Sequence, residues 1–188
     1  MVQIKTYIVM NKILVVVDMQ NDFITGTLAN ESAVNIIPNI EREIKSGDYS
    51  LIIFTRDTHN DDYLSTQEGK LLPVAHCIKN TNGWNVCDEL FNATINSNIP
   101  FITIDKPTFG FNGWKDSYFL NSIDNIDEFV MTGTCTDICV VSNALAIKAA
   151  FPETKVTCLS DCCAPLFGSE EKQNAALEVM KSCQVNVI

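Results

Sequence analysis

Six short runs of apolar residues recur along this 188-residue chain, separated by stretches with helical apolar spacing. The runs are continuous rather than alternating, which is typical of parallel strands buried on both faces. Regular alternation of strand and helix predicts a doubly wound α/β fold, a mainly parallel six-stranded sheet with helices on both faces. The predicted strands are 13–17, 51–55, 101–104, 129–133, 156–160 and 185–188, and the predicted helices are 32–45, 86–96, 114–121, 137–150 and 169–183.

The length and charge of the chain limit what it can do. The length favours a single domain over residues 1–188. The net charge of −10 argues against nucleic-acid partners, which select clustered Lys and Arg. No apolar run reaches the ~18 residues of a membrane span, so we expect no membrane partner. These features favour a soluble, cytoplasmic protein with small polar or neutral substrates, and the apolar composition permits a homo-oligomer.

The eight cysteines are scattered, and none forms a CxxC pair. Several lie in apolar strand or helix contexts, where a reduced and buried thiol is the ordinary state. We therefore expect free cysteines rather than a disulfide framework, which is typical of oxidising compartments. A thiol sensor is a weaker alternative.

Polar side chains follow three of the predicted strands. Asp18 ends the first strand, Lys106 follows the third, and Cys139 lies in the turn TGTCTDICV after the fourth. Each alone has an ordinary explanation, namely a capping Asp, a solvated Lys and a buried structural Cys. Together they supply a carboxylate to take the thiol proton, an ammonium beside the thiolate and a helix N-terminus that lowers the thiol pKa. This combination predicts a cysteine nucleophile.

Residues 57–86 form a segment that is too long and polar for a simple connection, so we expect it to carry function or cover the site. It holds both histidines of the chain, His59 and His76. Asp57 lies two residues before His59, and Glu68 lies between the histidines. Carboxylates and imidazoles suit Zn²⁺, Fe²⁺ or Mn²⁺. The segment predicts a divalent metal site, although a D-x-H pair also arises by chance.

These blocks together resemble the isochorismatase-like cysteine hydrolases. DMQNDF carries Asp18, Lys106 follows the third strand, and GTCTDICV carries Cys139. The D-T-H pair followed by EGKLLPVAHCIKNTNG resembles the nicotinamidase branch of that family. The resemblance covers nearly the whole chain in order, and it implies the isochorismatase-like hydrolase fold.

The resemblance also implies roles for single residues. Asp18 would be the general base and acid, Lys106 its charge partner and Cys139 the nucleophile. The backbone amides of Cys135 and Cys139 would form the oxyanion hole, after a cis peptide bond between Thr134 and Cys135. The implied activity is hydrolysis of nicotinamide to nicotinate and ammonia through a cysteine thioester.

Two further sets of residues are implied by the same resemblance. Phe23 and Phe109 would flank the planar ring of the substrate. A divalent metal, zinc in the first place with iron or manganese as alternatives, would be held by Asp57, His59, His76 and Glu68.

Other functions remain open at this point. One is a related metal-independent cysteine hydrolase of a small carbamoyl or amide substrate, expected if His76 does not reach the metal. Isochorismatase activity would leave the histidine segment without a role. A non-catalytic binding protein on the same fold would be indicated by loss of Asp18, Lys106 or Cys139, and all three are present.

Overall fold

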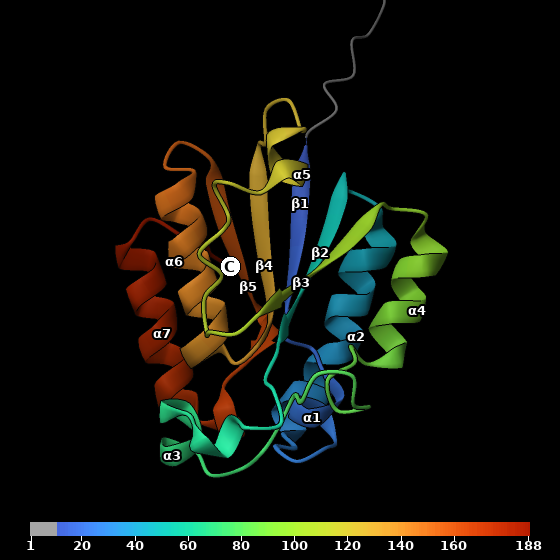
Figure 1. Ribbon diagram of the computed structural model, residues 1–188. Helices are drawn as coiled ribbons and strands as arrows, with labels where there is room; N and C mark the ends of the chain where they lie inside the picture. The colour runs from blue at the N-terminus through green and yellow to red at the C-terminus, as the bar shows by residue number, and fades with distance from the viewer. Residues whose placement is uncertain (1–10) are drawn as a thin grey trace, which may run out of the picture.

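The computed structural model describes residues 11–188. Its six strands form one sheet in the order β3-β2-β1-β4-β5-β6, and every neighbouring pair is parallel (Figure 1). The strands are β1 (Lys12–Val17), β2 (Leu51–Asp57), β3 (Phe101–Lys106), β4 (Glu128–Thr134), β5 (Lys155–Ala164) and β6 (Asn186–Val187). The predicted doubly wound α/β fold is confirmed, and β1 and β4 lie at the centre of the sheet.

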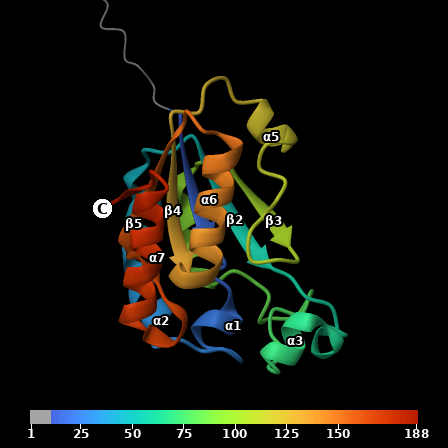
Figure 2. The ribbon, with the colours of Figure 1, turned by 90° about the vertical axis from the view of Figure 1, so that its left-hand side faces the viewer.

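Helices cover both faces of this sheet, α2 and α4 on one and α6 and α7 on the other (Figures 1 and 2). The helices are α1 (Asn21–Ile24), α2 (Glu31–Ser46), α3 (Gln67–Leu71), α4 (Asp88–Ser97), α5 (Tyr118–Asn121), α6 (Val141–Ala150) and α7 (Glu170–Ser182). Single turns occur at η1 (Tyr63–Ser65), η2 (Thr136–Val140) and η3 (Leu166–Gly168). Among the described residues, no helix combines the length and apolar character needed to cross a bilayer.

The side chains of β1 explain why the apolar runs are continuous. Ile13, Val15 and Val17 pack into the core beneath α6 and α7. Leu14 and Val16 pack into the second core, beneath α2 and α4. All five are fully buried, and burying each such side chain contributes about 1.5–3 kcal/mol. A polar residue at any of these positions would therefore face an apolar core.

The ends of the long helices follow from local chemistry. The Asn30 side chain accepts a hydrogen bond from the Ser32 N–H at the start of α2, and Gly47 ends that helix with φ 74°. Ser169 caps α7 by accepting from the Lys172 N–H at 3.4 Å. Side-chain acceptors at the N-cap satisfy amides that have no partner within the helix.

The structure corrects two expectations. The predicted helix 114–121 is limited to α5, because Trp114 is buried and donates its indole N–H to Asn143, which holds that part of the chain as a loop. The expectation that every strand is covered on both faces is wrong for β3. This strand lies at the edge of the sheet, and Phe101 is 38% exposed.

Candidate active site

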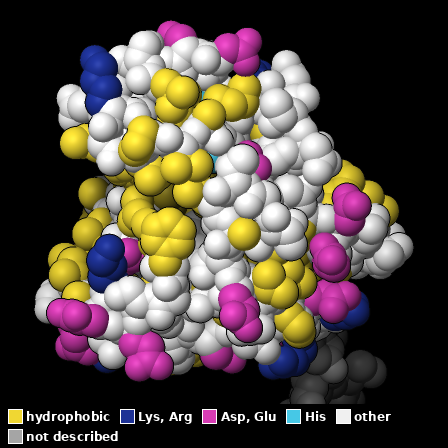
Figure 3. All heavy atoms as spheres, turned by 90° about the horizontal axis from the view of Figure 1, so that it is seen from below, with side chains coloured by type: hydrophobic (Ala, Val, Ile, Leu, Met, Phe, Trp, Pro, Cys, Tyr) yellow, Lys and Arg dark blue, Asp and Glu magenta, His cyan; other side chains and the backbone are white. Residues whose placement is uncertain are grey.

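The carboxyl ends of the central strands meet at one edge of the sheet, at the bottom of Figure 1. The parallel register pairs Asp57 with Lys106 across β2 and β3, and Val17 with Gly133 across β1 and β4. Residues that end or follow these strands are therefore brought side by side. Figure 3 shows this edge, where hydrophobic side chains gather and almost no histidine surface is visible.

Asp18 follows β1 directly and has no exposed surface. Its Oδ1 accepts a hydrogen bond from Thr55 Oγ1 at 2.6 Å, and its Oδ2 lies 2.6 Å from Lys106 Nζ. Burial raises the pKa of Asp18 above its ordinary value, while Lys106 and the Thr55 hydrogen bond act in the opposite direction. Asp18 is thus a carboxylate with an increased affinity for a proton.

Lys106 ends β3 and is also fully buried. Its Nζ lies 3.6 Å from Cys139 Sγ and 3.8 Å from Asp57 Oδ1, and it donates to the Thr108 carbonyl at 3.2 Å. Burial alone would lower the pKa of Lys106, but the neighbouring carboxylates and thiol hold it above the ordinary value. The side chain is therefore an ammonium ion between the thiol and two carboxylates.

Cys139 lies in the π-helical turn η2, immediately before α6, with 5% of its surface exposed. The peptide bond between Thr134 and Cys135 is cis. Gly133 has φ 113°, and a Cβ there would collide with the Val17 backbone, so only glycine suits this close approach of β4 to its neighbour β1.

The pKa of Cys139 is raised, whereas the sequence led us to expect that a helix N-terminus would lower it. Burial and the Asp18 carboxylate raise this pKa well above the ordinary value, and Lys106 offsets only part of the rise. A raised pKa favours the thiol form of Cys139, whose proton would have to be transferred when the group reacts.

The four residues proposed as metal ligands form a second polar cluster. Their ligand atoms all lie within 4.8 Å of one another. Asp57 Oδ2 lies 3.0 Å from His59 Nε2 and 3.4 Å from His76 Nε2, and Glu68 Oε1 lies 3.6 Å from His59 Nε2. Burial opposes ionisation of Asp57, but the two histidines and Lys106 hold its pKa well below the ordinary range.

The chemistry of this cluster fits a divalent metal ion. It offers two imidazole nitrogens and two carboxylates in a largely buried site. His76 Nδ1 is hydrogen-bonded to the Val74 carbonyl at 2.8 Å, which turns Nε2 toward the cluster. An outer hydrogen bond of this kind is typical of metal-binding histidines.

Cys139 shares a small cavity of about 40 Å³ with three members of the histidine cluster, Asp57, Glu68 and His76. Apart from these polar groups its wall is mostly apolar. Phe23 is buried and Phe109 is 46% exposed, and both contribute to the wall. The lining residues are Phe23, Leu28, Asp57, Glu68, Leu72, His76, Phe109, Cys135, Ile138, Cys139 and Leu166. This wall suits the apolar surface of a small molecule that turns a polar atom toward the cluster.

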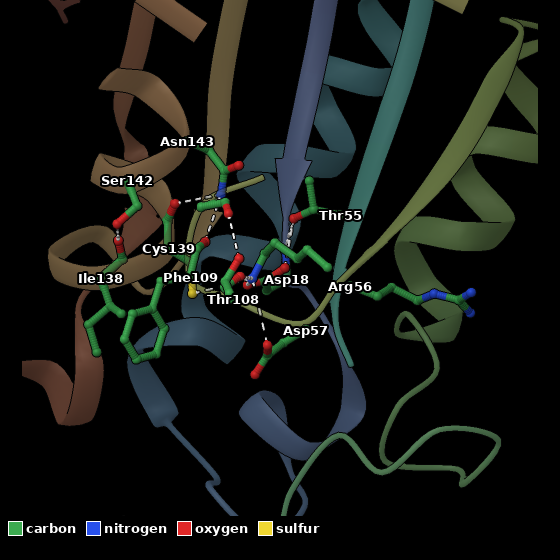
Figure 4. A network of polar contacts seen from close by, with 12 residues as sticks. Asp18, Thr55, Arg56, Asp57, Thr108, Phe109, Ile138, Cys139, Ser142 and Asn143 are labelled. Carbon is green, nitrogen blue, oxygen red and sulfur yellow. Dashed lines mark hydrogen bonds and ion pairs between the residues drawn. The ribbon is translucent and has the colours of Figure 1, made fainter. Parts of the chain in front are cut away.

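The sequence interpretation missed Asn143, on α6. Its Oδ1 accepts hydrogen bonds from the Phe111 N–H at 2.9 Å and the Trp114 indole at 3.2 Å. Its Nδ2 donates to the carbonyls of Phe109 and Cys139, at 3.0 and 2.8 Å (Figure 4). The fully buried amide thus ties the loop that bears Phe109 to the turn that bears Cys139. An Asn four residues after the cysteine, in a mainly apolar helix, was the available signal.

Three more residues were missed near the first two strands, and all are fully or nearly fully buried: Gln20, Asp22 and Thr55. Gln20 and Asp22 belong to the DMQNDF block, in which the sequence motif indicates roles only for Asp18 and Phe23. Buried polar groups require partners, so the available signal was the polar residues after β1 for Gln20 and Asp22, and the hydroxyl within the apolar run of β2 for Thr55.

The sequence matches the Isochorismatase domain over residues 12–188. This chain, with a cysteine and a carboxylate at the strand ends of a doubly wound sheet, therefore belongs to the isochorismatase family. It is 29% identical to the nicotinamidase of Saccharomyces cerevisiae over 94% of this chain and 99% of that protein. The resemblance inferred from the sequence motifs is confirmed.

Solved structures give the same result. A pyrazinamidase/nicotinamidase from Streptococcus mutans superposes with a TM-score of 0.77 at 25% identity, over 95% of this chain and 100% of the other. The pyrazinamidase of Pyrococcus horikoshii in complex with zinc superposes with a TM-score of 0.71 at 25% identity, over 95% and 98% of the two chains.

Proposed function

We propose that this protein hydrolyses nicotinamide to nicotinate and ammonia, with Cys139 as the nucleophile. The observation that carries the proposal is the cavity that Cys139 lines together with Asp57, Glu68 and His76 of the histidine cluster. A nucleophile alone would serve many acyl substrates, whereas the adjoining cluster provides a place for a ring nitrogen. The similarity to proteins named nicotinamidase and pyrazinamidase supports the same substrate class.

The cluster also suggests a cofactor. We propose that Asp57, His59, Glu68 and His76 hold a divalent metal ion, zinc in the first place. When bound, the ion would supply a Lewis acid for the pyridine nitrogen and so orient the carboxamide toward Cys139. The zinc complex of the Pyrococcus horikoshii protein supports this assignment.

The remaining chemistry belongs to the side chains of the chain itself. Asp18 takes the proton from the Cys139 thiol, and the Lys106 ammonium stabilises the thiolate as it forms. The thiolate adds to the amide carbon, and the carbonyl oxygen becomes an oxyanion facing the backbone amides of Cys135 and Cys139. Phe23 and Phe109 flank the ring.

Proton return completes the cycle. Asp18 gives its proton to the departing nitrogen, so the C–N bond breaks, ammonia leaves and a thioester remains on Cys139. Asp18 then takes a proton from water, whose oxygen attacks the thioester carbon. The C–S bond breaks, nicotinate is released and the thiol is restored with the proton held by Asp18.

Ammonia release from a panel of aromatic and aliphatic amides tests this proposal. We expect nicotinamide to be hydrolysed, Cys139→Ala to abolish the reaction and a chelator to reduce it. Cys183→Ala removes the exposed cysteine and is the matched control with unchanged activity. Hydrolysis of a small carbamoyl substrate that resists the chelator would instead favour the related metal-independent hydrolase. Undiminished activity of Cys139→Ala would disprove the mechanism.

We further propose that the whole chain forms one catalytic domain, in which residues 57–86 are the metal-site loop. The acidic composition and the eight free cysteines support a cytoplasmic location. We also propose that the protein forms a homo-oligomer, which light scattering tests by measuring its mass in solution.

A further inference from the structure

The four residues of the histidine cluster come from separate parts of the chain. Asp57 ends β2, His59 follows two residues later, Glu68 lies in α3, and His76 lies in the loop after α3. Two backbone hydrogen bonds join the histidine segments, from the His59 N–H to the Cys77 carbonyl and from the Lys79 N–H to the His59 carbonyl. A cation site made from such separate segments requires further contacts that fix their spacing.

Gln20 supplies one of these contacts. Its Oε1 accepts from the Asp57 N–H at 2.7 Å, and its Nε2 donates to the Asp57 carbonyl at 2.9 Å. The second Nε2 hydrogen is donated to the Trp84 carbonyl, also at 2.9 Å. The fully buried side chain thus uses both donors and holds the backbone on both sides of one cluster residue.

Asp22 supplies another contact, on the segment that bears His76. Its Oδ2 accepts from the N–H of Cys77 at 2.8 Å. Cys77 has φ 46°, a conformation that is unfavourable for a residue with a side chain, and the hydrogen bond to a carboxylate stabilises it. Asp22 itself has little room, because a Cβ on Gly83 would collide with its carboxylate.

Both contacts originate in one short segment. Gln20 and Asp22 flank Asn21, whose N–H donates to the Asn85 carbonyl, while the Asp22 N–H donates to the Gly83 carbonyl. In Figure 1, α1 lies beside the green segment that follows α3. The segment that begins with Asp18 therefore reaches two separate parts of the cluster.

We infer that Gln20 and Asp22 are positioning residues for the divalent cation, which they serve by fixing the backbone at Asp57 and beside His76. This inference rests on the metal site of the proposed function. Neither side chain is a ligand in this scheme. Their loss alters the spacing of the ligands, and therefore the affinity for the cation, while every ligand is still present.

The test measures zinc affinity of metal-stripped protein, by competition with a chromophoric chelator at constant pH. Asp22→Ala and Gln20→Ala are expected to weaken zinc binding by about 10- to 100-fold, as outer contacts of metal ligands generally do. Asp22→Asn keeps one acceptor for the Cys77 N–H, so its loss should be smaller than that of Asp22→Ala. If Gln20→Ala does not fold, the zinc affinity of Asp22→Asn still tests the inference.

The matched control is Asn30→Ala. Asn30 is a buried amide that makes hydrogen bonds to the Pro165 carbonyl and the Ser32 N–H, neither of which bears a cluster residue. It should lose stability but keep zinc affinity. Equal weakening in Asn30→Ala and Asp22→Ala, or unchanged affinity in both Asp22 variants, would overturn the inference.

Ammonia release from nicotinamide by the wild-type protein is measured in parallel. A wild-type protein that binds zinc but releases no ammonia would refute the proposed function, and the zinc titrations of the variants would still decide the inference. A wild-type protein that releases ammonia but binds no zinc would overturn the inference and leave the cysteine chemistry supported.

Discussion

The Lys106 ammonium lies 2.6 Å from Asp18 Oδ2, and neither side chain has exposed surface. Removing two charges from water costs several kcal/mol per ion, and their attraction offsets this cost only when the geometry is good. The same ammonium lies 3.6 Å from Cys139 Sγ. The ion pair therefore links the stability of the fold to the ionisation of the proposed nucleophile.

Lys106→Met should destabilise the protein by about 3–5 kcal/mol at neutral pH, because it leaves the Asp18 charge buried without its partner. Urea unfolding measures the change. Since loss of Lys106 raises the pKa of Asp18 further, the deficit should shrink as the pH falls and Asp18 becomes protonated. Adding Asp18→Asn should recover part of the stability at neutral pH. Equal unfolding midpoints for wild type and Lys106→Met would contradict the role of the pair.

The pH dependence of kcat/KM should show an acid limb above the ordinary aspartate pKa of 3.8, because burial raises the pKa of Asp18. Activity needs the unprotonated carboxylate, so it is lost as the pH falls through this raised value. The Thr55 hydrogen bond lowers the pKa of Asp18, so Thr55→Val should move the limb to higher pH.

Thr55→Val separates Asp18 from the histidine cluster as the source of that limb. Among the described contacts, Thr55 bonds to Asp18 and to no cluster residue. If the acid limb does not move in Thr55→Val, the limb reports another group, such as the histidine cluster.

Asp18→Asn should abolish ammonia release while making the thiol of Cys139 more reactive toward iodoacetamide. The Asp18 carboxylate raises the pKa of Cys139, so removing its charge increases the thiolate fraction at a given pH. Alkylation followed by mass spectrometry in a Cys183→Ala background measures this effect. Slower alkylation of Cys139 in Asp18→Asn would show that the carboxylate does not oppose thiolate formation at rest.

Asn143→Leu should raise KM for nicotinamide by about tenfold, since misplaced substrate-positioning groups lose orientation, and should change kcat less. The substitution removes the hydrogen bonds that tie the Phe109 loop to the Cys139 turn. Ser142→Ala, on the neighbouring position of α6, removes a single hydrogen bond to the Ile138 carbonyl and serves as the control. A fall in kcat with unchanged KM would place the effect on Cys139 instead of on the loop.

The strands were predictable because their alternate side chains enter two separate cores, so nearly every position is apolar. The exposed face of β3 was not predictable, because it results from the position of β3 at the edge of the sheet, which depends on the strand order. Asp18, Lys106 and Cys139 could be placed from strand ends alone. The pKa of Cys139 could not be predicted, because it depends on burial and on Asp18. These two residues are far apart in the sequence, and only the fold brings them together.

The positioning residues were harder to find for a related physical reason. Gln20 and Asp22 accept hydrogen bonds from the backbone N–H groups of Asp57 and Cys77. Every residue except proline has such a group, so the sequence does not indicate which one is the partner. Asn143 likewise bonds mainly to backbone groups. Motif spacing identifies residues by their own chemistry, whereas these residues matter through the segments that they hold.

The central pairing of β1 with β4 has a consequence for folding. The Thr132 hydroxyl on β4 bonds to the Val15 carbonyl on β1 across 117 positions of sequence. Contacts this distant require closure of a very long loop, which makes folding slow relative to helical proteins of similar size. Asp18 and Cys139 extend from these two strands, so a partly synthesised chain holds the acid long before it holds the thiol. Catalytic competence should therefore be among the last properties to return when the unfolded chain is diluted from denaturant.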